Sequence, residues 1–276
     1  MQLTIKKGAP LKQKTPCLVV GVFEGKFKDE LLQQLDAELE GVFAQATKSK
    51  EFSGKKGESL LLHTGKKVAA ERVLLLGLGK EKKLALPGLR QLASNAAKLL
   101  SDKQLGSFLL LLPPLMPKKN SLGQRVQALA EGLLLADYRY EKYLPKDRPG
   151  RPAPLEKISL LIADKESKSE ADAAVKAAEA IVSAVCFSRD LVNTPGNEKS
   201  PEYLARQAVT MAEQVGISAR LLDRKELERQ GFGAMLGVAQ GSERDPYLIV
   251  LEYRGGTADE KPVALVGKGV VFDAGG

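Results

Sequence analysis

Residues 17–47, CLVVGVFEGKFKDELLQQLDAELEGVFAQAT, show the pattern that decides the fold of this chain. Residues 17–23 form an apolar run that predicts a buried strand. From residue 29 to residue 47, leucine or phenylalanine returns at every fourth position (31, 35, 39 and 43), which predicts one helix with an apolar face. A buried strand followed by an amphipathic helix is a typical building unit of α/β folds.

The same alternation of apolar runs and helix-period stretches continues along the rest of the chain. It predicts further strands at residues 59–63, 72–76, 108–112, 158–163, 218–222, 247–253 and 263–266. It predicts further helices at residues 88–100, from an N-cap at Ser121 to residue 138, and at 169–190, 201–215 and 225–230. The fold class is therefore α/β, with parallel sheets covered by helices.

Residues 144–155, LPKDRPGRPAPL, contain four prolines and a glycine among charged residues, a composition typical of a linker or crossing loop. We therefore expect a first domain at residues 1–150 and a second at residues 151–276. The predicted strand at 158–163 fits on either side of this boundary.

The composition limits the class of protein. No run of about 18 apolar residues occurs, and the N-terminus MQLTIKKGAP lacks the features of a secretory signal, so we expect a cytoplasmic protein without membrane contact. The two cysteines, Cys17 and Cys186, are expected to be reduced core thiols. The net charge of +8 suits a solvated surface, because its lysines are scattered with few aromatic residues between them; nucleic-acid binding is the alternative.

A candidate site lies at residues 267–276, GKGVVFDAGG, where Lys268 precedes Asp273 by five residues. A dinucleotide fingerprint fails because Phe272 stands where its third glycine belongs, and a phosphate loop fails because no Ser or Thr follows the lysine. A metal site fits, since a carboxylate can bridge two divalent ions. A lysine–aspartate ion pair at a strand end fits as well, and the residues alone leave both open.

Three stretches, in sequence order, resemble the leucyl (cytosol) aminopeptidase family of two-metal exopeptidases. They are FSRDLVNTPGNEKSPEYLA (187–205), GAMLGVAQGSERDPYLIVLEYRG (233–255) and ALVGKGVVFDAGG (264–276). They resemble the start of the family's catalytic domain, its glycine-rich loop with the following strand, and its metal-site strand and loop. Weaker similarity at FSGKKGESLLLH (52–63) and EGLLLADYRYEKY (131–143) extends the resemblance over essentially the whole chain.

The resemblance implies a macro-like N-terminal domain, followed by the start of an α/β catalytic domain with a central mixed sheet. It also implies a homo-hexamer, two divalent ions (Mn²⁺ or Zn²⁺), and hydrolysis of peptides at a free N-terminus during intracellular turnover. By position, Lys268 would bind one metal and Asp273 would bridge both. An amine must be neutral to bind a metal, so the lysine needs a strong positive field beside it.

The resemblance places the family's catalytic lysine, its arginine and its remaining metal ligands beyond Gly276, so no catalytic residue is assigned in this chain. Two donors cannot saturate two such ions, and we expect the chain alone to be inactive and to bind divalent metal weakly. Two positions depart from the family pattern: Ala274 replaces a small hydroxyl residue, and Gly196 stands where a second proline is common.

Other readings compete with this one. A DNA-binding accessory or transcriptional regulatory role fits the net charge, and a nucleotide-binding module ranks last because the first domain lacks a glycine-rich phosphate loop. His63, the sole histidine, is expected to be structural, and Arg189 with Asp190 to form a surface or helix-end pair. NTPGN at 193–197 is interpreted as a helix stop.

Overall fold

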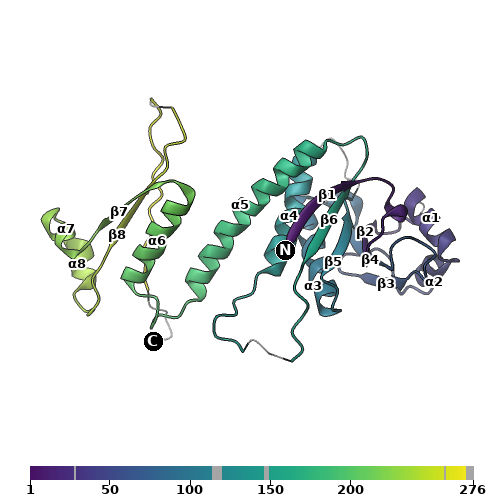
Figure 1. Cartoon of the computed structure of the whole chain (residues 1–276), viewed down its shortest axis with the longest axis horizontal. Coiled ribbons are helices and arrows are strands. Elements are labelled where there is room, and N and C mark those ends of the chain that lie inside the picture. The colour runs from purple at the N-terminus through teal and green to yellow at the C-terminus, as the bar shows by residue number, and fades with distance from the viewer. Residues whose placement is uncertain (28, 114–119, 146–148, 258, 272–276) are drawn as a thin grey trace. The chain divides into compact units, whose positions relative to one another are not determined.

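The computed structural model describes residues 1–27, 29–113, 120–145, 149–257 and 259–271. The chain divides into two compact units, Met1–Cys186 and Phe187–Gly276, whose elements are labelled in Figure 1. In these ranges no helix combines the length and the apolar character needed to cross a membrane.

The first unit is built on a sheet that has six strands in the described residues, in the order β1-β6-β5-β2-β4-β3. Neighbouring strands are parallel, except that β3 runs antiparallel to β4 at one edge. The strands are β1 (Gln2–Lys7), β2 (Leu18–Phe23), β3 (Ser59–His63), β4 (Arg72–Gly79), β5 (Ser107–Leu111) and β6 (Lys157–Ile162). The mostly parallel α/β architecture is thus as predicted, although β1 was not foreseen.

Helices cover both faces of this sheet, and each face has its own hydrophobic core. One core receives α3 (Leu86–Asp102), α4 (Leu122–Asp137) and α5 (Lys168–Asn193); the other receives α1 (Glu30–Glu38) and α2 (Val42–Lys48). Residues of a strand alternate between the cores: Val19 of β2 belongs to the first, and Leu18 and Val20 to the second. Burial on both faces explains why central strands such as β2 and β4 are continuous apolar runs.

The helix predicted at residues 29–47 is two helices, so that prediction was wrong in one respect. Glu40 and Gly41 have φ of 57° and 82°, which ends α1, and the Asp36 carboxylate accepts a hydrogen bond from the Ala44 N–H to begin α2. Leu35 and Phe43 nevertheless enter the same core. The four-residue period therefore recorded a shared apolar face and not one continuous helix.

The contact between α3 and α4 is the most extensive one between two elements of the described chain. Ser121 caps α4 as predicted: its Oγ accepts from the Gln124 N–H at 3.2 Å, and the Gln124 side chain accepts from the Ser121 N–H at 3.0 Å. Gly132 lets the two helices approach closely, since a Cβ there would lie 2.3 Å from the Arg90 carbonyl oxygen. Beside it, Arg90 pairs with Glu131 at 2.5 Å.

The segment after residue 150, which we expected in the second domain, packs with the first unit. β6 lies between β1 and β5, and α5 belongs to this unit as far as Cys186. Two hydrogen bonds hold the proline-rich stretch before β6 to α3. The Ser101 hydroxyl donates to the Ala153 carbonyl, and the Ala153 N–H donates to the Ser101 carbonyl at 3.0 Å. It thus acts as a crossing loop from α4 to β6.

The second unit holds the end of α5, a two-stranded antiparallel sheet and three further helices in the described residues. These elements are α6 (Pro201–Val215), β7 (Ser218–Leu222), α7 (Arg224–Arg229), α8 (Gly233–Ala239) and β8 (Leu248–Glu252). Both α6 and β7 have the predicted bounds. α8 lies where the resemblance implied a glycine-rich loop.

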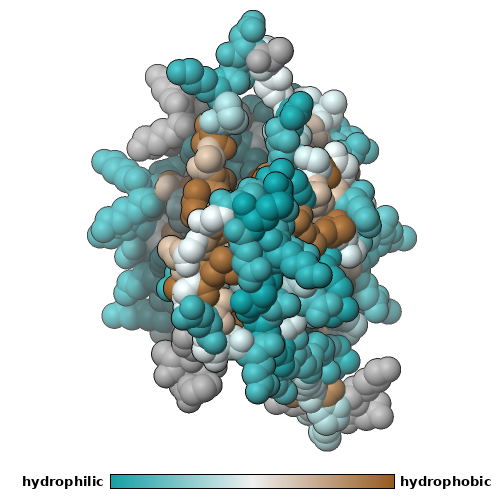
Figure 2. Space-filling model, turned by 90° about the vertical axis from the view of Figure 1, so that its left-hand side faces the viewer, coloured by the Kyte–Doolittle hydropathy of each residue, from teal (hydrophilic) through white to brown (hydrophobic). Residues whose placement is uncertain are grey.

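The strand predicted at residues 263–266 is absent from the described structure, which corrects that expectation. Val263, Leu265 and Val266 are 88%, 95% and 97% exposed, and among the described residues β7 and β8 pair only with each other. Without a partner strand, the apolar run has no ladder to join. Figure 2 shows hydrophobic (brown) side chains among hydrophilic ones, and the exposed ones of this unit include Val238, Val250 and Leu251.

Candidate functional site

The predicted metal ligands lie at the end of the second unit. Lys268 is in a segment with no helix or strand, and its side chain is exposed. Asp273 falls outside the described residues. The structure therefore gives no distance between the Lys268 and Asp273 side chains, and their role as metal ligands stays a prediction.

The described residues do not assemble a metal site by themselves. Across the described ranges, no three His, Cys, Asp or Glu side chains gather closely enough to hold an ion. Lys268, in the part of the chain that is described, makes no hydrogen bond or ion pair. Lys268 could bind a metal only through a neutral amine, and the described residues place no other predicted donor beside it.

The first two stretches of the family resemblance lie together in the second unit. α5 ends at Asn193, where the predicted stop signal begins, and the Thr194 hydroxyl donates to the Asp190 carbonyl at 2.7 Å. Ser200 then caps α6 by accepting from the Tyr203 N–H at 3.0 Å. Arg244 of the second stretch donates to the Asn197 carbonyl at 3.4 Å. This contact joins the helix stop to the loop before β8.

The other candidate residues, His63 and the two cysteines, have structural roles. His63 is exposed at the end of edge strand β3, opposite Arg72, and lines none of the described pockets. Cys17 is buried, Cys186 is half-buried, and neither forms a disulfide. Burial raises the pKa of the Cys17 thiol to about 12, so this group is an inert part of the core.

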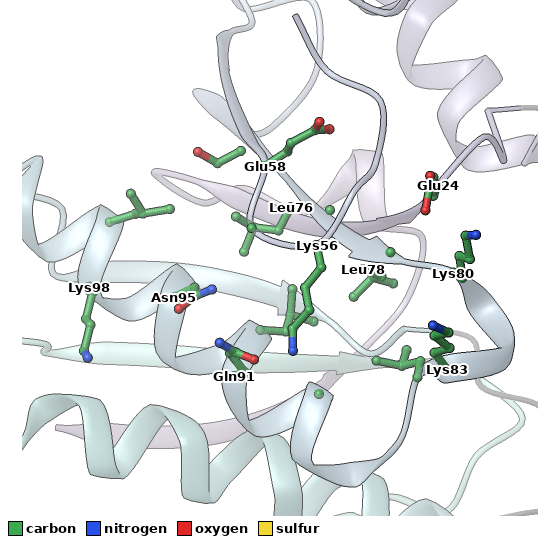
Figure 3. A pocket seen from close by; sticks show the side chains of 18 of the residues that line it. Glu24, Lys56, Glu58, Leu76, Leu78, Lys80, Lys83, Gln91, Asn95 and Lys98 are labelled. Carbon is green, nitrogen blue, oxygen red and sulfur yellow. The ribbon is translucent and has the colours of Figure 1, made fainter. Parts of the chain in front are cut away.

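A cavity of about 860 Å³ lies in the first unit, and sequence reasoning did not find it. We call it the lysine pocket. The carboxyl end of β4 forms one wall, residues 88–102 of α3 form another, and the loop at residues 56–59 forms a third (Figure 3). Leu76, Leu78 and Leu92 give it apolar lining. Its amines come from Lys56, Lys80, Lys83 and Lys98.

The loop that carries Lys56 is fixed by Glu58. The Glu58 carboxylate accepts hydrogen bonds from the Ser53 N–H at 2.7 Å, from the Ser53 hydroxyl at 2.9 Å and from the Lys55 N–H at 3.1 Å. Burial alone would raise the pKa of Glu58, but these hydrogen bonds outweigh it and hold the pKa below its usual 4.5. Glu58 is thus a structural anion at neutral pH.

The lysine pocket escaped notice because its charges are far apart in sequence. In the sequence, Lys56, Lys80 and Lys83 are interpreted as scattered surface lysines: Lys56 lies in a loop, whereas Lys80 and Lys83 lie at the two ends of one short 3-10 helical turn. One signal was available: Gln91, Asn95, Lys98 and Asp102 follow each other at three- or four-residue spacing and mark a polar stripe on α3.

Comparison with known proteins identifies relatives for both units. Residues 19–147 match the model of the cytosol aminopeptidase family N-terminal domain, and residues 186–276 match that of the family's catalytic domain. The chain is 47% identical, over its whole length, to a probable cytosol aminopeptidase of Syntrophotalea carbinolica, and 40% identical to one of a Geobacter species. This chain belongs to the cytosol aminopeptidase family.

The cytosol aminopeptidase fold is also found in solved structures. A tomato leucine aminopeptidase mutant matches with a TM-score of 0.84 and 29% identity over the whole chain, covering 55% of that protein. The bottromycin maturation enzyme BotP, in a complex with Mn, matches in fold with a TM-score of 0.67 and 20% identity over 87% of the chain and 45% of BotP. The chain spans 55% of the length of the two curated relatives named above.

Proposed function

We propose that the protein to which this chain belongs is a metal-dependent aminopeptidase that releases N-terminal residues, leucine among them, from peptides. The observation that carries this proposal is the order of the matches: the N-terminal and catalytic domain models of one family match the two parts of the chain in succession. Identity of 47% over the whole chain to a probable cytosol aminopeptidase adds to it.

In this proposal Lys268 and Asp273 are metal ligands, and the ions are Mn²⁺ or Zn²⁺. Bound divalent ions would supply Lewis acidity and an activated water for peptide hydrolysis. Lys268 could act as a ligand only after losing its proton, which requires partners that the described residues do not provide. We therefore propose that the 276-residue chain binds these ions weakly and does not hydrolyse peptides on its own.

Two measurements test the function. Calorimetry with MnCl₂ or ZnCl₂ on the 276-residue chain should show no tight stoichiometric binding, and leucyl-p-nitroanilide should not be cleaved. The protein extended to the length of its relatives should cleave this substrate only with added Mn²⁺ or Zn²⁺. If the extended, folded protein lacks aminopeptidase activity with either ion, the proposed function is wrong.

The ligand assignment is tested separately in the extended protein. Lys268→Ala and Asp273→Asn should each abolish activity and weaken metal binding, because each removes a donor. Lys261→Ala, a change at an exposed lysine in the same segment, is the matched control and should leave both unchanged. Full activity in the Lys268 and Asp273 variants would contradict their role as ligands.

The assembly and the location are further proposals. The family resemblance supports a homo-hexamer, which light scattering on the extended protein would measure, and a cytoplasmic location, which fractionation would test. DNA binding rests on the net charge of +8 and stays a prediction. Titration with duplex DNA at low salt should give no saturable binding if the lysines are merely solvated.

A further inference from the structure

The lysine pocket is a built cavity away from the predicted metal ligands. Its volume of about 860 Å³ falls within the range of small-molecule sites, roughly 300 to 1,000 Å³. Its walls include the carboxyl end of β4, the α3 helix and the loop at residues 56–59, and Lys80 and Lys83 come from the segment between β4 and α3. Two of these walls are regular elements of the first sheet's core, so the cavity has a fixed frame.

The pocket concentrates positive charge that nothing in the described chain neutralises by direct contact. Elsewhere in the first unit, lysines find partners: Lys26 pairs with Glu81 and Lys67 with Glu40. Within the described ranges, by contrast, the four pocket amines form no hydrogen bond or ion pair. Of the three acidic side chains in the lining (Glu24, Glu58 and Asp102), Glu58 is already engaged by Ser53 and Lys55. An unneutralised group of amines in a cavity attracts an anion.

The polar groups are spread along the cavity. In Figure 3, Lys80 and Lys83 lie at one end, and Lys98 lies at the other end beside Asn95. The Lys56 side chain reaches down between the two ends, toward Gln91. The amides of Gln91 and Asn95 also make no hydrogen bond within the described structure. Such amides can both donate to and accept from the edge of a heterocycle.

These features together select a class of ligand. Lysine amines bind phosphate groups as point charges. The leucine lining near α3 suits an apolar or planar body, which an inorganic anion lacks. Lys80 and Lys83 at one end, together with Lys56 in the middle, can hold more than one phosphate, whereas the two amides lie toward the other end, beside Lys98.

We propose that the lysine pocket binds a nucleoside diphosphate or a closely similar organic phosphate. The phosphates lie against Lys56, Lys80 and Lys83. The heterocycle lies beside Gln91 and Asn95, over the Leu92 side of the pocket. The site is independent of peptide hydrolysis, because none of its groups belongs to the predicted metal ligands.

The test is calorimetry of the 276-residue chain with ADP at low salt, without metal. Saturable binding with one site is expected, and the affinity should fall as salt rises. Lys56→Gln and Lys83→Gln should each weaken ADP binding by about tenfold, since each removes a charge-assisted contact. Lys176→Gln, at an exposed lysine on α5 that lines none of the described pockets, is the matched control and should bind ADP like the wild type.

A second variant tests the contribution of the ligand's organic part separately from that of its phosphate charge. Asn95→Phe fills the amide end without removing an amine, so it should weaken ADP binding and leave the weak binding of inorganic phosphate unchanged. The proposal is overturned if folded wild-type protein shows no saturable ADP binding, or if the lysine variants bind ADP like the control. Equal affinity for inorganic phosphate and ADP would also overturn it, as would duplex DNA that binds without competition from ADP.

Discussion

Replacing Gly132 with alanine has two opposing effects on the stability of the protein. Gly132 lies inside α4 against α3, and a Cβ there would be 2.3 Å from the Arg90 carbonyl oxygen, whereas ordinary contacts begin at 3.4 Å. The oxygen belongs to the backbone and cannot rotate away. Relief therefore requires the two helices to separate locally by about 1 Å.

The sizes of these two effects decide whether the substitution stabilises or destabilises the protein. Alanine in a helix interior is favoured over glycine by about 1 kcal/mol. Against this, overpacking a tight contact costs about 1–3 kcal/mol, and a gap of about 0.5–1 Å forfeits a quarter to a half of the dispersion energy across it. The separation would also strain the Arg90–Glu131 ion pair, whose Glu131 side chain is only 8% exposed. We expect Gly132→Ala to lower the free energy of unfolding by about 1–2 kcal/mol.

Urea unfolding followed by circular dichroism at 222 nm measures this change, and suits a chain without tryptophan. Gly123→Ala in the same helix is the matched control. Its Cβ would meet the Glu170 Oε1 at 3.2 Å, and this oxygen also accepts a hydrogen bond from the Gly123 N–H at 2.7 Å. A shift of a few tenths of an ångström in the Glu170 side chain relieves the contact and keeps this hydrogen bond, so we expect a change within about 0.5 kcal/mol. A Gly132→Ala protein as stable as the wild type, or more stable, would refute the reasoning.

Three further predictions concern the first unit. Ser121→Ala should lower the free energy of unfolding by about 1 kcal/mol in urea, because α4 loses its N-cap; an unchanged midpoint would contradict this. Glu58→Gln should destabilise the protein at pH 7. Because the folded-state pKa of Glu58 is lowered, the difference from wild type should shrink as the pH falls below 4.5, and a pH-independent difference in thermal unfolding would rule this out. Cys17 should resist iodoacetamide at pH 8 until the protein unfolds, because burial raises its pKa to about 12; mass spectrometry that finds native Cys17 labelled would show the opposite.

Much of the fold could be predicted because burial leaves a direct mark on the sequence. β3, α6 and β7 have the predicted bounds, since apolar runs and helical periods there coincide with real ends such as the Ser200 cap. β1 was missed because its burial pattern has only Ile5 fully buried, so it lacks a continuous apolar run. Edge strands with one polar side carry a weaker signal than central ones.

The candidate site was less accessible to sequence reasoning. Lys268 and Asp273 lie only five residues apart in the sequence, so their spacing and the family resemblance were enough to single them out. The lysine pocket instead collects Lys56 from a loop and Lys98 from α3, which the parallel sheet brings to one place. Periodicity describes single elements and does not report which loops meet at the end of a strand.

The position of β6 between β1 and β5 has a consequence for the order in which this protein takes shape. β1 is synthesised long before β6, yet in the described sheet its one strand partner is β6, with Gln2 opposite Lys157. Until those later residues are synthesised, β1 has no hydrogen-bonding neighbour and β5 has an open edge, which can pair with other chains. The sheet therefore closes by a contact between residues far apart in sequence, a type of step that slows folding. Expression of the first unit in isolation should accordingly extend through α5 to Cys186, so that β1 and β5 both have their partner.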